Sequence, residues 1–234
     1  MKPMRSWFGT GWAALMIGCA VDDRLDARPA GDDTAEYRDA STSPDVSALD
    51  AAPNRLVEIT DEGHLDVLSI HLVEGMLALD IDRFGFTRLI DPAEALIVLP
   101  VTSRTRLVGM VDLTFLGEPG SRVWNLDAGW SVRGVPAGTF RNDELQVQLW
   151  SVSGPGNFAI WRFNDASLPA VDFASTRPMP QMISISHRAH THRRWSFTAP
   201  GTYRIDFSVT GTRADNDERL SSSRESYTFE VRNE

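Results

Sequence analysis

The sequence has one cysteine, one lysine and no long run of apolar residues. A lone cysteine cannot form an internal disulfide bond, so the fold cannot depend on one. The longest apolar stretch ends before residue 19 and is shorter than the roughly 20 residues that a membrane-spanning helix needs. The formal net charge is −9, which argues against the clustered basic surface that nucleic acid requires, and we expect no nucleic-acid partner.

The first eighteen residues predict an export signal. Lys2 and Arg5 form a positive n-region, and the stretch from Trp7 to Gly18 fits an apolar h-region. A small residue directly before Cys19 is typical of bacterial lipoprotein signals, in which the thiol receives a diacylglycerol and cleavage occurs in front of it. We predict a signal peptide over 1–18 and a membrane anchor at lipidated Cys19. The alternatives are an ordinary secretory signal or a free buried cysteine.

Residues 19–54 predict an acidic, disordered tether. Nine aspartates and glutamates stand against three arginines, and small or polar residues fill most of the rest. Such a segment buries too little apolar surface to offset its ordering entropy. In a Gram-negative envelope, Ala20 as the second residue of the mature chain is compatible with sorting to the outer membrane. The predicted localisation is therefore the cell envelope, lipid-anchored at the outer membrane or cell surface.

Residues 55–234 have the length of one domain and carry many strand patterns. Apolar residues alternate with polar ones over 145–149, 203–209 and 227–231, and two further strands flank a Glu74-Gly75 turn. Only 91–99 is expected to hold a helical turn, with Pro92 at its first position. These patterns predict an all-β fold, an immunoglobulin-like β-sandwich, with a closed barrel as the alternative. Most tryptophans are expected in the core, with Trp150 as the exposed exception.

A histidine cluster near the C-terminus is the sharpest local feature. His190 and His192 are two residues apart, so on a strand their imidazoles share one face and can bind one metal ion. His187 lies three residues earlier, and His64 opens an early strand. Asp66 shares the face of His64 and can act as a ligand or orient an imidazole. A histidine-rich turn that binds only its own loops is the alternative, and nearby arginines favour it.

Several segments together resemble the choice-of-anchor M domain, which is similar to actinobacterial surface-anchored wall repeats. The segments are Gly63-His64-Leu65-Asp66, Phe115-Leu116-Gly117, 154–161 (GPGNFAIW), 190–203 (HTHRRWSFTAPGTY) and 227–231 (YTFEV). Members of this family share the domain and differ in how they attach to the surface. They tend to be encoded beside metal-type ABC transporters, which implies capture of zinc or manganese. The family's histidines match His64, His190 and His192, whereas the single domain here departs from repeat-bearing members.

Two functions follow as hypotheses. The first is a surface metal-binding accessory of metal uptake, with His64, His190 and His192 as zinc ligands and His187 or Asp66 as the fourth. It requires His64 to lie within about 10 Å of His190. The second is a metal-free surface module for protein or glycan contact, using loops and Trp150. We expect no enzyme, because the Gly-x-Ser-x-Gly, phosphate-loop and HExxH motifs are missing and no general base is evident.

Overall fold

A computed structural model of the chain describes residues 56–60, 64–83, 88–107, 111–187 and 189–234. The predicted signal peptide, Cys19 and the predicted tether over 19–54 lie outside these residues. None of the helices in the described ranges is long and apolar enough to cross a membrane.

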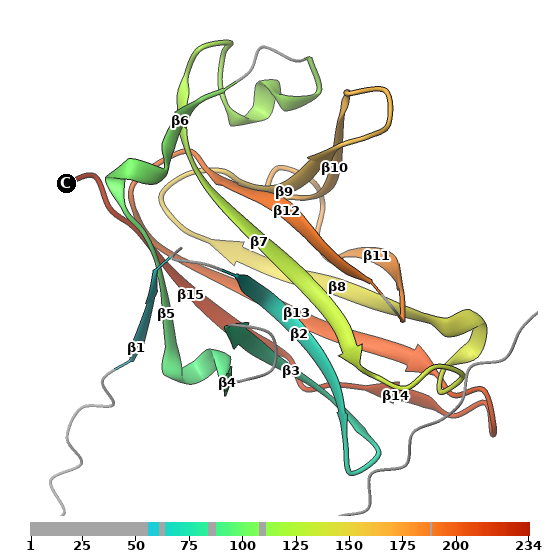
Figure 1. Ribbon diagram of the computed structural model, residues 1–234. Coiled ribbons are helices and arrows are strands. Elements are labelled where there is room, and N and C mark those ends of the chain that lie inside the picture. The colour runs from blue at the N-terminus through green and yellow to red at the C-terminus, as the bar shows by residue number, and fades with distance from the viewer. Residues whose placement is uncertain (1–55, 61–63, 84–87, 108–110, 188) are drawn as a thin grey trace, which may run out of the picture. The chain divides into compact units, whose positions relative to one another are not determined.

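Two β-sheets pack as a sandwich, which confirms the predicted fold class (Figure 1). One sheet has the strand order β1-β5-β15-β13-β8-β11, with β14 paired to β13, and the other has the order β10-β9-β12-β7-β2-β3-β4, with β6 paired to β7. The first sheet consists of β1 (Val57–Thr60), β5 (Ala95–Leu99), β8 (Glu144–Ser153), β11 (Gln181–Ser186), β13 (Gly201–Thr212), β14 (Arg219–Ser221) and β15 (Glu225–Val231). The second consists of β2 (Leu65–Val73), β3 (Met76–Arg83), β4 (Arg88–Ile90), β6 (Arg104–Arg106), β7 (Arg122–Gly134), β9 (Phe158–Phe163), β10 (Pro169–Ala174) and β12 (His190–Phe197).

Both sheets are mixed. β5 runs parallel to β1 and to β15, and β2 runs parallel to β7, while the remaining pairs are antiparallel. The helical turn expected at Pro92 is the 3-10 turn η1 (Pro92–Glu94), which Asp91 caps by accepting from the backbone N–H of Ala93. Three further 3-10 segments, which the sequence patterns missed, are η2 (Val101–Ser103), η3 (Val111–Leu116) and η4 (Arg141–Asp143).

The core lies between the sheets and is rich in aromatic residues. Trp195 on β12 contacts Phe207 and Phe229 of the opposite sheet, with ring centroids 5.9 and 5.8 Å apart. Three tryptophans are buried in this core, as predicted: Trp124, Trp130 and Trp195. Trp161 is buried in a second cluster outside it, whereas Trp150 is 36% exposed on the outer face of β8. Burying these rings removes a large apolar area from water, which dominates the stability of a fold that has no disulfide.

Tyr203 fixes the corner between β12 and β13. Its hydroxyl donates to the carbonyl of Ala199, 2.9 Å away, and its ring packs where a Cβ on Gly154 would overlap it. A Cβ on Gly156 would lie 2.9 Å from the Tyr203 hydroxyl. The glycines of 154–161 and the tyrosine of 190–203 are therefore parts of one packing unit.

A second apolar cluster covers part of the outer face of the eight-stranded sheet. Its buried members are Leu107, Leu113, Leu116, Val123, Ala159, Trp161 and Ala174. The η3 segment contributes Leu113 and Leu116, so it shields one end of β7 and β9 from solvent. The rest of this outer face, toward β2, carries polar side chains.

Replacing Trp195 with alanine is expected to lower the free energy of unfolding by about 3–5 kcal/mol, because a buried aromatic side chain is lost and a cavity is left. Urea denaturation measures this change. Trp150→Ala is the matched control and is expected to cost much less, since Trp150 is partly exposed. Equal losses for the two variants would contradict the described core.

Candidate metal centre

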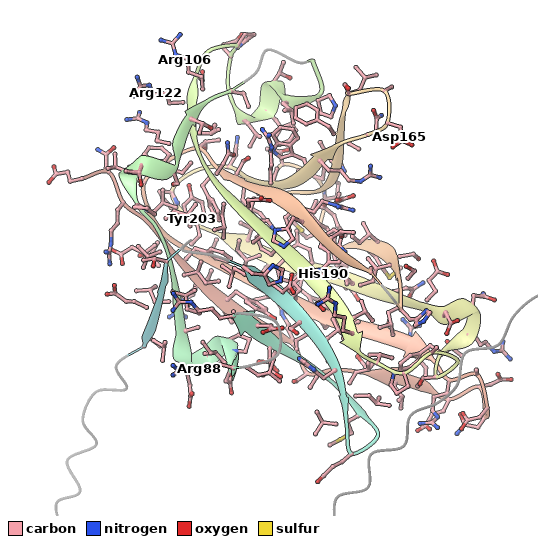
Figure 2. The ribbon with its side chains drawn as sticks, in the orientation of Figure 1. Arg88, Arg106, Arg122, Asp165, His190 and Tyr203 are labelled. Atoms are coloured by element: carbon pink, nitrogen blue, oxygen red, sulfur yellow. The ribbon has the colours of Figure 1, made fainter. Side chains whose placement is uncertain are left out.

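Three neighbouring strands, β2, β7 and β12, position the polar cluster. In the sheet, Gly129 of β7 stands opposite Asp66 of β2 on one side and opposite His192 of β12 on the other. The pairing of β2 with β7 shifts register just after Asp66, an irregularity of the kind that re-aims side chains. His190 lies two residues from His192 on the same face, and His64 immediately precedes β2. Figure 2 shows His190 among the strands near the middle of the sheet.

Four side chains converge at this point. His64, Asp66, His190 and His192 each offer one ligand atom, and these atoms lie within 4.8 Å of one another. The Nε2 atoms of His64 and His190 are 3.0 Å apart. Asp66 Oδ2 is 3.0 Å from the first of these nitrogens and 3.2 Å from the second. The requirement that His64 lie near His190 is therefore met.

Gly129 makes room for this convergence. A Cβ built at Gly129 would overlap Asp66 Oδ1 and would lie 3.2 Å from His192 Cδ2. Any larger residue would therefore fill the space over β7 into which Asp66 and His192 reach. Glycine inside a strand often marks such a close approach, and here the small residue creates a cradle for side chains from both neighbours.

Asp66 is the buried member of the group. Its residue is 1% exposed, and its Oδ1 has no hydrogen-bond partner among the described residues. Nε2 of His192 lies 3.9 Å from this oxygen. A buried carboxylate is costly unless a positive charge or hydrogen bonds compensate it, and a divalent cation supplies that compensation. The donor set and the unpartnered oxygen therefore fit a metal ion.

The outer nitrogens of two imidazoles have neighbours of their own. Nδ1 of His192 lies 3.6 Å from Asp127 Oδ1, so this carboxylate favours a proton on Nδ1 and leaves Nε2 as the ligand atom. Nδ1 of His190 lies 2.8 Å from a guanidinium nitrogen of Arg133. Because arginine only donates, this contact makes Nδ1 of His190 an acceptor. Arg133 therefore competes with coordination through Nε2 of His190.

Burial lowers the pKa of His190 below the ordinary imidazole value. The negative charge of Asp66 acts in the opposite direction, while Arg133 and the two neighbouring histidines lower the pKa further. The lowered pKa favours the neutral imidazole, which is the form that binds a metal ion.

His187 does not join the group. The chain crosses from one sheet to the other between β11 and β12, and His187 stays at the β8 side of that crossing. Its backbone N–H donates to the carbonyl of Asp143, and its Nδ1 lies 3.6 Å from the Asp143 carboxylate. The fourth position beside the three histidines is thus taken by Asp66. His71 is buried on β2, with Nε2 3.9 Å from Asp80 Oδ2.

Three contributors escaped the sequence patterns: Gly129, Asp127 and Arg133. The only sequence signal was a glycine in the middle of a long strand pattern. The two charged residues carried none, because their relation to the histidines depends on the register between β7 and β12.

No protein-family model matches the chain, and no curated protein matches it significantly.

In the metal-free protein, His190 is expected to carry its proton on Nε2, because Arg133 donates to Nδ1. Long-range ¹H–¹⁵N NMR of the imidazole distinguishes the two tautomers directly. Replacing Arg133 with methionine removes the donor and is expected to shift the tautomer equilibrium toward Nδ1–H. A predominantly Nδ1-protonated His190 in the wild type would contradict this assignment.

Proposed function

We propose that this chain is a lipid-anchored cell-surface protein whose β-sandwich binds a divalent metal ion, zinc, as an accessory of metal uptake. The observation that carries the proposal is the convergence of four side chains across β7: His64 and Asp66 at the start of β2, and His190 and His192 on β12. No other group of three or more metal-ligating side chains occurs among the described residues.

The ligand chemistry favours zinc over the hard cations. Calcium and magnesium prefer shells of oxygen ligands, whereas this group offers three imidazole nitrogens and one carboxylate oxygen. Four such donors match the coordination number that zinc adopts in proteins. Among the candidates that the resemblance implied, manganese is less suited, because divalent zinc binds nitrogen ligands more tightly.

The exposure of the ligands suits exchange with the surroundings. The side chains of His64, His190 and His192 are 31%, 23% and 31% exposed, whereas that of Asp66 is 2% exposed. An ion can therefore reach the exposed imidazoles from solvent, and the buried carboxylate of Asp66 can coordinate it from the protein side. Reversible access of this kind suits capture and transfer better than a purely structural metal site.

The anchor and the partner are the parts of the proposal that rest on sequence. The signal over 1–18 and Cys19 support attachment to the cell envelope, at the outer membrane or cell surface. The resemblance to choice-of-anchor M domains supports a metal ABC transporter system as the partner. Lipidation of Cys19 would then place the metal centre near that transporter.

The full-length protein is expected to bind about one equivalent of zinc, with a rise in melting temperature. Isothermal titration calorimetry and elemental analysis measure stoichiometry and affinity. The affinity is expected to fall as the pH is lowered through the imidazole range near about 6.5, since protons compete for the same nitrogens.

Matched histidine variants locate the zinc site. His192→Ala is expected to lower zinc affinity by at least about tenfold, because one of the four proposed ligands is lost. His187→Ala is the control and is expected to bind zinc like the wild type, because His187 faces Asp143. Absence of zinc binding in the wild type, or loss in both variants alike, would refute the site.

Gly129→Ala tests the cradle without removing any ligand. The added methyl group overlaps Asp66 Oδ1, so Asp66 must move and zinc affinity is expected to fall by about tenfold or more. Asn125→Ala, on the same face of β7, is the control for a change on this strand, and circular dichroism checks that both variants fold. Unchanged zinc affinity in Gly129→Ala would show that Asp66 is not a ligand.

The metal-free interaction module receives less support from the structure. The indole N–H of Trp150 already donates to Ser208, 2.8 Å away, and the Arg224 guanidinium lies 5.3 Å from the ring centroid. The ring is therefore not a free stacking platform. A glycan or protein partner lost only on Trp150→Ala would favour this module instead.

A further inference from the structure

A groove of about 520 Å³ adjoins the metal centre on the outer face of the eight-stranded sheet. Its lining includes His192 and Asp127, so it shares one imidazole with the centre. Arg194, Trp161 and Phe163 form another part of the lining. This volume suits a small organic ligand.

The groove lies at a basic end of an acidic protein. Three exposed arginines from three strands belong to its lining: Arg106 of β6, Arg162 of β9 and Arg194 of β12. None of these three forms an ion pair with a described carboxylate. Figure 2 shows Arg106 and Arg122 at the end of the sheet where β6 pairs with β7. These two are direct partners in register, and like charges at such positions are destabilising.

Arg194 is the guanidinium best placed to recognise a ligand. It leaves the same face of β12 as His190 and His192, because residues two apart on a strand share a face. Its guanidinium carbon lies 5.2 Å from the ring centroid of Trp161 and 5.1 Å from that of Phe163. Stacking on two rings restrains the guanidinium and leaves its N–H groups able to bind carboxylate or phosphate oxygens.

The neighbouring Arg193 has a different role. Its Nε donates to Asp172 at 2.9 Å, and its guanidinium lies over Trp130 on the core side of the sheet. Asp127 is the one acidic side chain in the lining, and it faces Nδ1 of His192. The positive charges of the groove therefore exceed the negative ones.

We propose that the groove binds a small organic anion with carboxylate or phosphate groups, and that the centre takes up its metal ion together with this anion. The inference rests on the proposed metal-binding function. His192 couples the two sites, since its Nε2 faces the metal ligands while its ring borders the groove. A cation at the centre attracts the anion, and the anion in turn favours the cation.

Equilibrium dialysis of the full-length protein tests the proposal. Radiolabelled citrate is the carboxylate probe and inorganic phosphate is the phosphate probe, each with and without equimolar zinc. We expect about one anion per protein in the presence of zinc, and at least about tenfold weaker retention without it. Whichever probe is retained identifies the oxygen chemistry of the ligand.

Arg194→Gln is expected to weaken anion retention by about tenfold or more while zinc is still retained, because a charge-assisted contact is lost. Arg204→Gln, an exposed arginine on the other sheet, is the matched control and is expected to behave as the wild type. If the protein retains zinc but neither anion, the proposal that the groove binds an anion is wrong, while the proposed metal binding still stands. Anion retention that is equal in Arg194→Gln and the wild type would also overturn the proposed anion binding.

Zinc retention by the wild type tests the proposed metal binding separately from the anion site. If the wild type retains no zinc, the proposed function fails, and joint uptake fails with it. Anion retention that still depends on Arg194 would then support the groove as an anion site alone.

Discussion

The carboxylate of Asp66 is the constraint on which the polar face of this sandwich depends. It is buried on β2, it faces three imidazoles, and one of its oxygens has no hydrogen-bond partner in the described part of the chain. A charge in that position must be balanced by something close to it. Three features bring the imidazoles close to this carboxylate. They are the register shift after Asp66, the small Gly129 on β7 and the two-residue spacing of the histidines on β12.

The aromatic core provides the rigidity that such a site needs. Trp195 and Phe197 lie on the core face of β12, while His190 and His192 lie on its outer face. The same strand therefore anchors itself between the sheets and presents ligands to solvent. A site built on paired strands keeps its geometry better than one built on loops. The spacing between the two histidines and Trp195 on β12 thus joins the centre to the fold.

The sandwich could be predicted from the sequence, because apolar and polar residues alternate over 145–149, 203–209 and 227–231. This alternation indicates which face of each strand is buried. The sequence also placed His190 and His192 on one face. The contributions of Gly129 and Arg133 could not be predicted, because they follow from register across β7, which a single strand pattern does not encode. The spacing made His187 a reasonable candidate for the fourth ligand. It lies beside Asp143 instead, because the chain passes from one sheet to the other between His187 and β12.

The position of β7 between the ligand-bearing strands has a mechanical consequence. His64 and His190 are 126 residues apart in the chain, and an ion held by both would clasp β2 to β12 across a strand that contributes no ligand. Such a clasp closes a long loop, and loop closure of this kind restricts the unfolded chain much as a disulfide bond does. A protein with one cysteine would thereby gain a removable cross-link whose strength follows the supply of metal.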